Sequence, residues 1–200
     1  MNKDKIIKEL VEFVEGRMDF NTFWQNYKTN KDYYELFDIK LGNIYSYLRN
    51  STLNHHLNIY NPNTRLGKDI ICNDICHFLE YNNISFNKTD MYEKSFMFAL
   101  SVQPNYVYIE DEDFLNKIIE QAPEGLKKGE KKKWIKNHIK EMFKYDVKPP
   151  KWIQDPEWPI VNGKPLVFKE QTKERKDDER VFYTFYDPDT LEEKVIVQFY

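Results

Sequence analysis

The sequence predicts an α+β protein, with a mostly helical N-terminal part packed on a small C-terminal antiparallel β-sheet of about three strands. Apolar residues recur at three- and four-residue spacing through most of 1–146, whereas short alternating or β-branched runs follow in 147–200. The 200 residues are enough to bury a core, and the 16% aromatic content is far above that of disordered chains. We therefore expect a mainly helical part at 1–146 and a proline/tryptophan segment with the sheet at 147–200, packed as one unit.

Three short helices are expected at the start of the chain. The first covers 4–15, between a possible cap at Asp4 and a stop at Gly16. The second begins at Asp19, and a third follows the break at 29–32. Their aromatic side chains predict a compact helical bundle.

The middle of the chain is expected to continue as helices separated by turns. A helical stretch is possible at 44–48, and the Asn-rich stretch 51–64 contains a turn signal at 61–63. Clear apolar stripes predict helices over 67–81 and 91–102.

The next helices are delimited by charge and by proline. The acidic run 110–113 suits the start of a helix, because carboxylates cap free N–H groups and oppose the helix dipole. Pro123 and Gly125 end that helix, and another follows over 127–144.

Pro149 and Pro150 stop the last helix, and strands are expected after them. The candidates are 166–168, 181–186 and 194–200, with a turn at 187–190. The charged patch 174–179 is interpreted as a solvated loop between two strands.

Composition and the absence of known motifs exclude several classes of function. The net charge of −3 excludes a globally basic nucleic-acid binder, and the charged fraction of 32% leaves no room for a membrane span. Nucleotide-binding glycine loops, the serine-hydrolase elbow and the HExxH zinc motif are absent from the sequence. The first residues lack the apolar stretch of a secretory signal, so we expect a cytoplasmic protein that needs no cofactor.

Two cysteines four residues apart, Cys72 and Cys76, are the first chemical candidate. They lie within an apolar helical stripe, which favours buried structural thiols. A metal site completed by His55, His56 or His77, or a cysteine nucleophile with a histidine base, is the alternative.

The second candidate is the basic stretch 127–144, which carries eight lysines against two glutamates. A solvated lysine face opposite an apolar core face is the simpler interpretation. A surface for an acidic partner is the alternative, with Lys128, Lys132 and Lys136 as its binding residues. Nucleic acid is not favoured, because the stretch contains no arginine.

The third candidate is the segment 149–165. Its prolines fix the backbone, and Trp152 and Trp158 can bury large apolar areas. The segment is expected either to staple the helical part to the sheet or to present Trp158 and Gln154 to a partner. We expect Trp152 to be the more buried tryptophan and Trp158 the more exposed one, since Glu157 and Pro159 flank it.

The run PPKWIQDPEWPIVNGKPLVFKEQ, with the ending VIVQFY, resembles a C-terminal signature of poorly characterised bacterial proteins that are loosely associated with toxin–immunity loci. A similar W-x-Q pattern occurs in β-rich immunity-like modules. The resemblance covers about 126–200 and carries no catalytic or metal-binding residues. It implies an immunity-like protein that covers the surface of a partner protein.

Together these observations predict a non-enzymatic cytoplasmic protein-binding module. The alternatives are a small metal-dependent or cysteine/histidine enzyme built around His55, His56, Cys72, Cys76 and His77, and a nucleic-acid binder that uses the basic helix.

Overall fold

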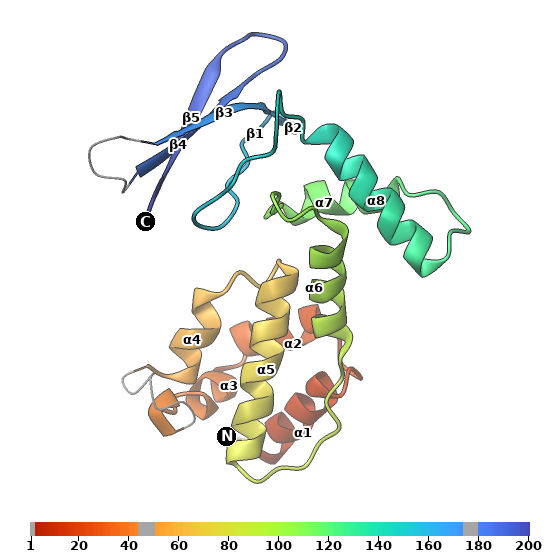
Figure 1. Ribbon diagram of the computed structural model, residues 1–200. Helices are drawn as coiled ribbons and strands as arrows, with labels where there is room; N and C mark the ends of the chain where they lie inside the picture. Colours follow the sequence, from red (N-terminus) through yellow and green to blue (C-terminus); the bar gives the residue numbers. More distant parts are fainter. Residues whose placement is uncertain (1–2, 44–50, 174–179) are drawn as a thin grey trace. The chain divides into compact units, whose positions relative to one another are not determined.

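The computed structural model describes residues 3–43, 51–173 and 180–200, and it confirms the α+β class (Figure 1). Two compact units are present, Met1–Met97 and Phe98–Tyr200. The change in sequence character at residue 147, on which the predicted division rests, lies inside the second unit. Within the described ranges, no helix has the length and apolar character needed to cross a membrane.

Five α-helices lie wholly within the first unit, as far as it is described. The expected helices at the start of the chain are present, and the one expected at 67–81 begins two residues earlier, after a cap at Thr64. The stretch 44–48, where a helix was considered possible, lies outside the described residues. The elements are α1 (Lys3–Val14), α2 (Phe20–Thr29), α3 (Lys31–Leu36), the 3-10 turn η1 (Leu41–Asn43), α4 (Leu53–Ile59) and α5 (Arg65–Tyr81).

Helix α4 was not predicted, because its sequence is mostly polar. Thr52 caps it by accepting a hydrogen bond from the His55 N–H. Its buried Asn54 donates to the Tyr34 carbonyl at 2.6 Å, and its Leu53 and Leu57 are buried in the core of the first unit, so contacts with other parts of the chain fix this helix.

Close packing explains the single glycine inside α5. A Cβ atom on Gly67 would lie 1.9 Å from the Asn61 carbonyl oxygen. The position therefore accepts no larger residue unless the 61–64 turn moves.

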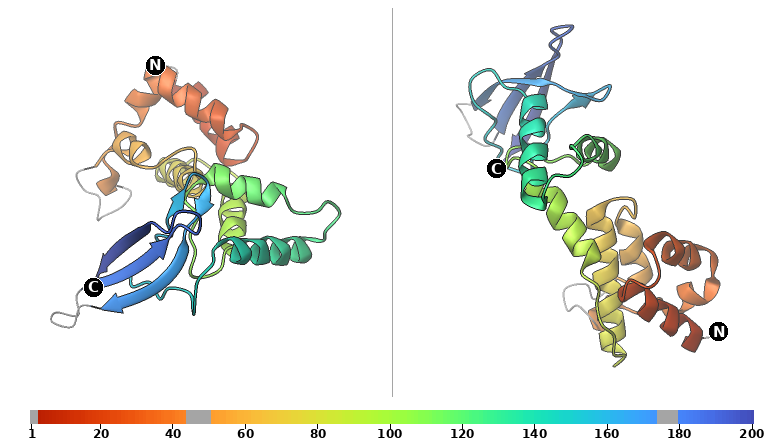
Figure 2. Two further views of the ribbon diagram at one scale, coloured as in Figure 1. Left: turned by 90° about the horizontal axis from the view of Figure 1, so that it is seen from above. Right: turned by 90° about the vertical axis from the view of Figure 1, so that its right-hand side faces the viewer.

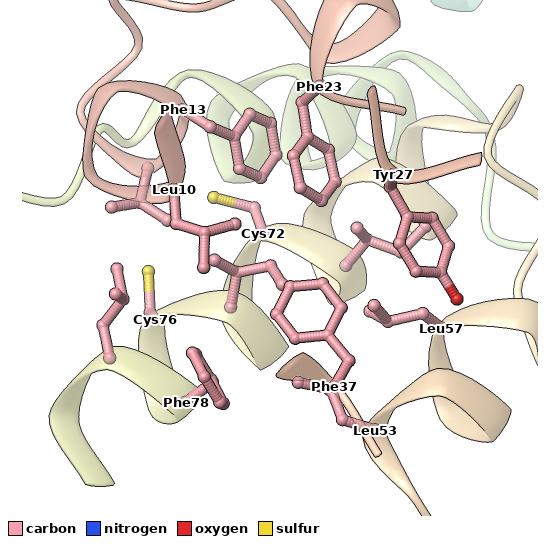
Figure 3. Packing of buried hydrophobic residues seen from close by; sticks show 14 of the residues in the cluster. Leu10, Phe13, Phe23, Tyr27, Phe37, Leu53, Leu57, Cys72, Cys76 and Phe78 are labelled. Atoms are coloured by element: carbon pink, nitrogen blue, oxygen red, sulfur yellow. The ribbon is translucent and has the colours of Figure 1, made fainter. Parts of the chain in front are cut away.

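The core of the first unit combines aromatic rings with aliphatic side chains (Figure 3). Phe13 and Phe23 stack with their centroids 4.1 Å apart, and Phe37 meets Phe78 edge-on at 5.3 Å. Such pairs stabilise a core beyond the area that they bury. The helical bundle expected from the aromatic spacing is therefore present.

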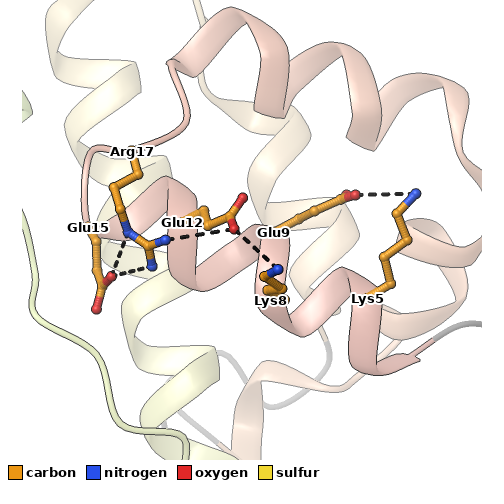
Figure 4. A network of polar contacts seen from close by, with 6 residues as sticks. All are labelled: Lys5, Lys8, Glu9, Glu12, Glu15 and Arg17. Atoms are coloured by element: carbon orange, nitrogen blue, oxygen red, sulfur yellow. Dashed lines mark hydrogen bonds and ion pairs between the residues drawn. The ribbon is translucent and has the colours of Figure 1, made fainter.

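The exposed side of α1 carries a row of ion pairs (Figure 4). Hydrogen bonds from the Asn87 N–H and from Arg17 hold the pKa of Glu15 below its ordinary value. Glu15 thereby links the end of α1 to the segment before α6. The residues of the row are Lys5, Lys8, Glu9, Glu12, Glu15 and Arg17.

Helix α6 (Met91–Val102) begins in the first unit and ends in the second. Helices α7 (Glu112–Glu120) and α8 (Lys128–Met142) follow. Asp111 caps α7 by accepting a bond from the Phe114 N–H at 2.9 Å, which confirms the predicted role of the acidic run.

The sheet has the order β3-β4-β5, and both pairings are antiparallel (Figures 1 and 2). Its strands are β3 (Val167–Lys173), β4 (Arg180–Tyr186) and β5 (Glu193–Phe199). Strand β3 is longer than predicted, because pairing with β4 extends it through polar residues that carry no strand signal. The predicted loop at 174–179 lies outside the described residues.

A separate hairpin pairs β1 (Ile160–Val161) with β2 (Lys164–Pro165). Asn162 and Gly163 form its turn with φ values of 51° and 73°. Two successive positive φ angles are typical of the tight hairpin turn that an Asn-Gly pair favours.

The core of the second unit lies on one face of the three-stranded sheet, which we call the inner face. Val181, Tyr183 and Phe185 of β4 point into it and are fully buried. Ile135 and Ile139 of α8, and Phe143 directly after it, belong to the same cluster. The sheet is therefore packed on helices, as its small size requires.

Candidate protein-binding surface

The opposite face of the sheet, which we call the outer face, is open to solvent. It is formed by alternate residues of all three strands, because successive side chains point to opposite faces. On β5, the exposed fractions are 49% for Val195, 37% for Val197 and 54% for Phe199. The register sets Val197 opposite the half-buried Phe182 of β4, so the apolar side chains adjoin one another.

The outer face combines this apolar row with an open strand edge. Strand β5 has one neighbour, β4, among the described strands. Apolar patches and edge strands exposed together are typical of surfaces that bind another chain.

The segment 149–165 lies against the inner face, where one side chain from each strand holds its backbone. We call Gln171 of β3, Tyr183 of β4 and Gln198 of β5 the backbone clamp. Gln171 accepts from the Lys151 N–H at 3.0 Å and donates to the Lys151 carbonyl at 3.1 Å. The Tyr183 hydroxyl accepts from the Ile153 N–H and donates to the Lys151 carbonyl, both at 3.1 Å.

Gln198 is the buried member of the backbone clamp, with no exposed surface. Its side-chain oxygen accepts from the N–H groups of Ile153 and Gln154 at 3.2 and 3.1 Å. Its amide nitrogen donates to the Asp155 carbonyl at 2.8 Å and to Glu157 at 3.0 Å. All of its hydrogen-bonding groups are therefore used to fix the segment.

Burial raises the pKa of the Tyr183 hydroxyl above its ordinary value. Burial thus favours the protonated hydroxyl, which is the form that donates to the Lys151 carbonyl.

Trp158 is buried, with an exposed fraction of 6%, so the prediction that it is the more exposed tryptophan is wrong. Its indole N–H donates to the Leu166 carbonyl at 2.7 Å. Its ring lies 5.5 Å from that of Phe143, the residue that ends α8, and 5.2 Å from that of Phe185 in the sheet. The polar Glu157 and the turn-forming Pro159 indicated an exposed position. The ring nevertheless points into the core, next to the hairpin β1–β2.

Trp152 is half-buried and is therefore the less buried of the two. Its ring packs on Tyr183 with centroids 4.4 Å apart, and its N–H donates to the Tyr106 carbonyl. The expectation that the segment staples helix to sheet is confirmed, but Trp158 is the residue that touches both.

Gln154, the second predicted partner-binding residue of this segment, is exposed and already bonded within the chain. Its side-chain amide donates to the Phe199 carbonyl at 2.7 Å. It therefore lies at the end of β5 and holds the last residue of that strand.

The three predicted lysines lie on one stripe of α8, at intervals of four residues. Lys128 is exposed, whereas Lys132 and Lys136 are half-buried. The Lys132 ammonium lies 5.7 Å from the centre of the Phe98 ring. Their role in partner binding stays a prediction.

The structure does not bring the two cysteines and the histidines of the predicted metal or enzyme site together. Both cysteines are free thiols buried among core side chains (Figure 3). A hydrogen bond with Cys76, together with burial, raises the pKa of Cys72, which makes it a poor nucleophile. His55 and His77 are exposed, and His77 lies 3.1 Å from Glu80. Among the described residues, no group of three or more His, Cys, Asp or Glu side chains is placed to hold a metal ion.

His56 instead meets Asp74, a partner that the sequence did not indicate. Its Nδ1 lies 2.7 Å from the Asp74 carboxylate, and its Nε2 lies 3.3 Å from the Tyr60 hydroxyl. Asp74 is buried on α5, so the pair ties α4 to α5.

The outer-face residues were missed by sequence reasoning, although a signal was present. Strand β5 reads Val-Ile-Val before Gln198, and apolar residues on both faces are typical of strands that are covered on both sides. In the described structure only one of these faces is covered.

Comparison with family models, with curated proteins and with solved structures finds no match for this chain. The resemblance of the C-terminal run to immunity-associated proteins stays a prediction.

Proposed function

We propose that this chain is a non-enzymatic, cytoplasmic protein-binding module, immunity-like in action, whose outer face covers part of a partner protein. The observation that carries the proposal is the row Val195, Val197 and Phe199 on an edge strand. Burial of this row on binding removes apolar area from water, which is the main favourable term in most protein association.

The backbone clamp supports the same function from the inner face. A rigid sheet loses little conformational entropy when it binds, so less of the interaction energy is spent on ordering. Because Gln198 and Gln154 hold β5 in place, the row is displayed in one arrangement.

Site-specific cross-linking followed by reconstitution tests the proposal. A photoreactive phenylalanine analogue is placed at Val195, and the captured protein is identified and purified. Its affinity is then measured for the natural chain and for the double variant Val195→Thr/Val197→Thr. We expect at least a tenfold loss, since each threonine replaces a buried methyl group with a hydroxyl.

The matched control is Val161→Thr, an exposed valine on the separate hairpin. Equal affinity for the natural chain and the double variant would contradict the proposal. Light scattering of the natural chain provides a second check. A dimer that the double variant abolishes would show that the outer face binds a second copy instead.

A further inference from the structure

A groove of about 420 Å³ lies along the side of β3 that does not pair with β4. One wall comes from residues of 147–151 and the other from residues of 168–173. The volume falls within the range of sites that hold organic ligands.

The course of the chain explains why this space is open. At one end, the Asp146 N–H donates to the Phe168 carbonyl at 3.0 Å, and the Phe168 N–H donates to the Lys144 carbonyl. At the other end, Gln171 of the backbone clamp holds Lys151. Between these attachments lie Pro149 and Pro150, which have no N–H to donate to a neighbouring strand.

The lining is cationic with an apolar component. It contains four lysines, at positions 148, 151, 169 and 173, and one acid, Glu170. Lys169 is paired with Glu193 at 2.6 Å, and Lys173 donates to the Tyr200 hydroxyl. Within the described part of the chain, the structure gives the ammonium groups of Lys148 and Lys151 no hydrogen bond or ion pair. Val147, Pro149 and Phe168 supply the apolar surface.

We infer that this groove binds an acidic peptide segment with an apolar side chain, contributed by the partner protein. The inference rests on the proposed protein-binding function and adds the chemistry of the partner. Carboxylates of the segment pair with Lys148 and Lys151, and its apolar side chain packs on the exposed Val147 and the half-buried Pro149. Glu170 among the lysines disfavours a compact polyanion such as phosphate, because it repels a ligand that gathers all four ammonium groups.

Fluorescence anisotropy with a defined probe tests the groove directly. The probe is a fluorescein-labelled peptide, Asp-Glu-Phe-Glu-Asp, and the matched neutral peptide is Asn-Gln-Phe-Gln-Asn. We expect the acidic peptide to bind the natural chain and the neutral peptide to bind much more weakly. The double variant Lys148→Gln/Lys151→Gln should lose about tenfold in affinity, because two charge pairs are removed.

The control variant is Lys127→Gln/Lys133→Gln, which removes the same charge from exposed positions at the N-cap and in the first half of α8. Its affinity for the acidic peptide should stay within about twofold, since distant exposed charges are screened at physiological salt. An equal loss in both double variants, or no binding to the natural chain, overturns the inference. Displacement of the peptide by inorganic tripolyphosphate at a concentration below the peptide's own dissociation constant also overturns it, in favour of a phosphate ligand.

The failure of this inference is distinguishable from failure of the proposed function. The outer-face variant Val195→Thr/Val197→Thr should leave peptide binding unchanged. If the peptide binds in the groove while cross-linking at Val195 yields no partner, the outer-face proposal fails alone. If the captured partner binds the lysine double variant as tightly as the natural chain, the groove inference fails alone.

Discussion

Both faces of the three-stranded sheet carry apolar side chains. The faces differ in the polar groups that lie beside those side chains. On the inner face, Tyr183 and Gln198 provide hydrogen bonds for a segment that could not otherwise be buried. On the outer face, Val195 lies opposite the half-buried Thr184 and Val197 opposite the half-buried Phe182, and neither neighbour is a buried polar residue. Apolar side chains alone therefore do not distinguish the covered face of the sheet from the open one; the buried polar side chains beside them do.

The largest expected effect is on the inner face. Trp158→Ala should lower the free energy of unfolding by about 3–5 kcal/mol, because it removes a buried ring between α8 and the sheet. Trp152→Ala, the matched control, should cost clearly less, since that ring is half-buried. The denaturant midpoints of the two variants show which substitution lowers the stability more. A Trp152→Ala protein that is less stable than Trp158→Ala would contradict the comparison.

The next effect concerns the backbone clamp. Gln198→Met keeps the approximate shape of the side chain and removes its hydrogen bonds, which leaves the Gln154 N–H and the Asp155 carbonyl without that partner. We expect a cost of about 2–3 kcal/mol. Gln171→Met removes an equivalent pair of bonds at a partly exposed site, so its cost should stay below about 1 kcal/mol. Equal costs, measured by urea unfolding, would show that burial of the clamp is unimportant.

A smaller effect is expected for Tyr183→Phe, about 1 kcal/mol at neutral pH. The folded pKa of Tyr183 is raised above its unfolded value. Its contribution is therefore fully present below the unfolded pKa of about 10 and is lost as pH rises through the folded pKa. The phenylalanine variant should consequently lose less stability than the natural chain in alkaline titration. Parallel pH profiles of the two proteins would argue against this hydroxyl as a member of the clamp.

The smallest effect on stability belongs to the outer face. Val195→Thr and Val197→Thr should each change the free energy of unfolding by no more than about 0.5 kcal/mol, because both side chains are exposed. Thermal unfolding of the single variants measures this. A loss of 2 kcal/mol or more would mean that the outer face is covered within the folded chain and is not available to a partner.

Much of the fold was predictable, because its signals are local. The caps at Asp19 and Asp111 and the Asn162-Gly163 turn depend on residues next to one another in the chain. Helix α4 was not predicted, because the hydrogen bond that holds Asn54 joins it to Tyr34, 20 positions away in the sequence.

The candidate site was less predictable than the fold. The orientation of Trp158 depends on the hairpin that follows it and on α8, which neighbouring residues do not encode. The exposure of Val195 depends on which face of the sheet the segment 149–165 covers. An alternating pattern gives the two faces of a strand, but it does not say which one is left open when both are apolar.

The backbone clamp also bears on the rate at which the second unit folds. Its hydrogen bonds join residues that are 20, 32 and 44 positions apart, whereas helices close contacts over three or four positions. Long loops must be closed before such contacts contribute, so topologies of this kind reach the native state slowly. The ring of Trp158 is enclosed only when the sheet and α8 meet around it. Its fluorescence should therefore change late in refolding, after the helical signal in circular dichroism has recovered.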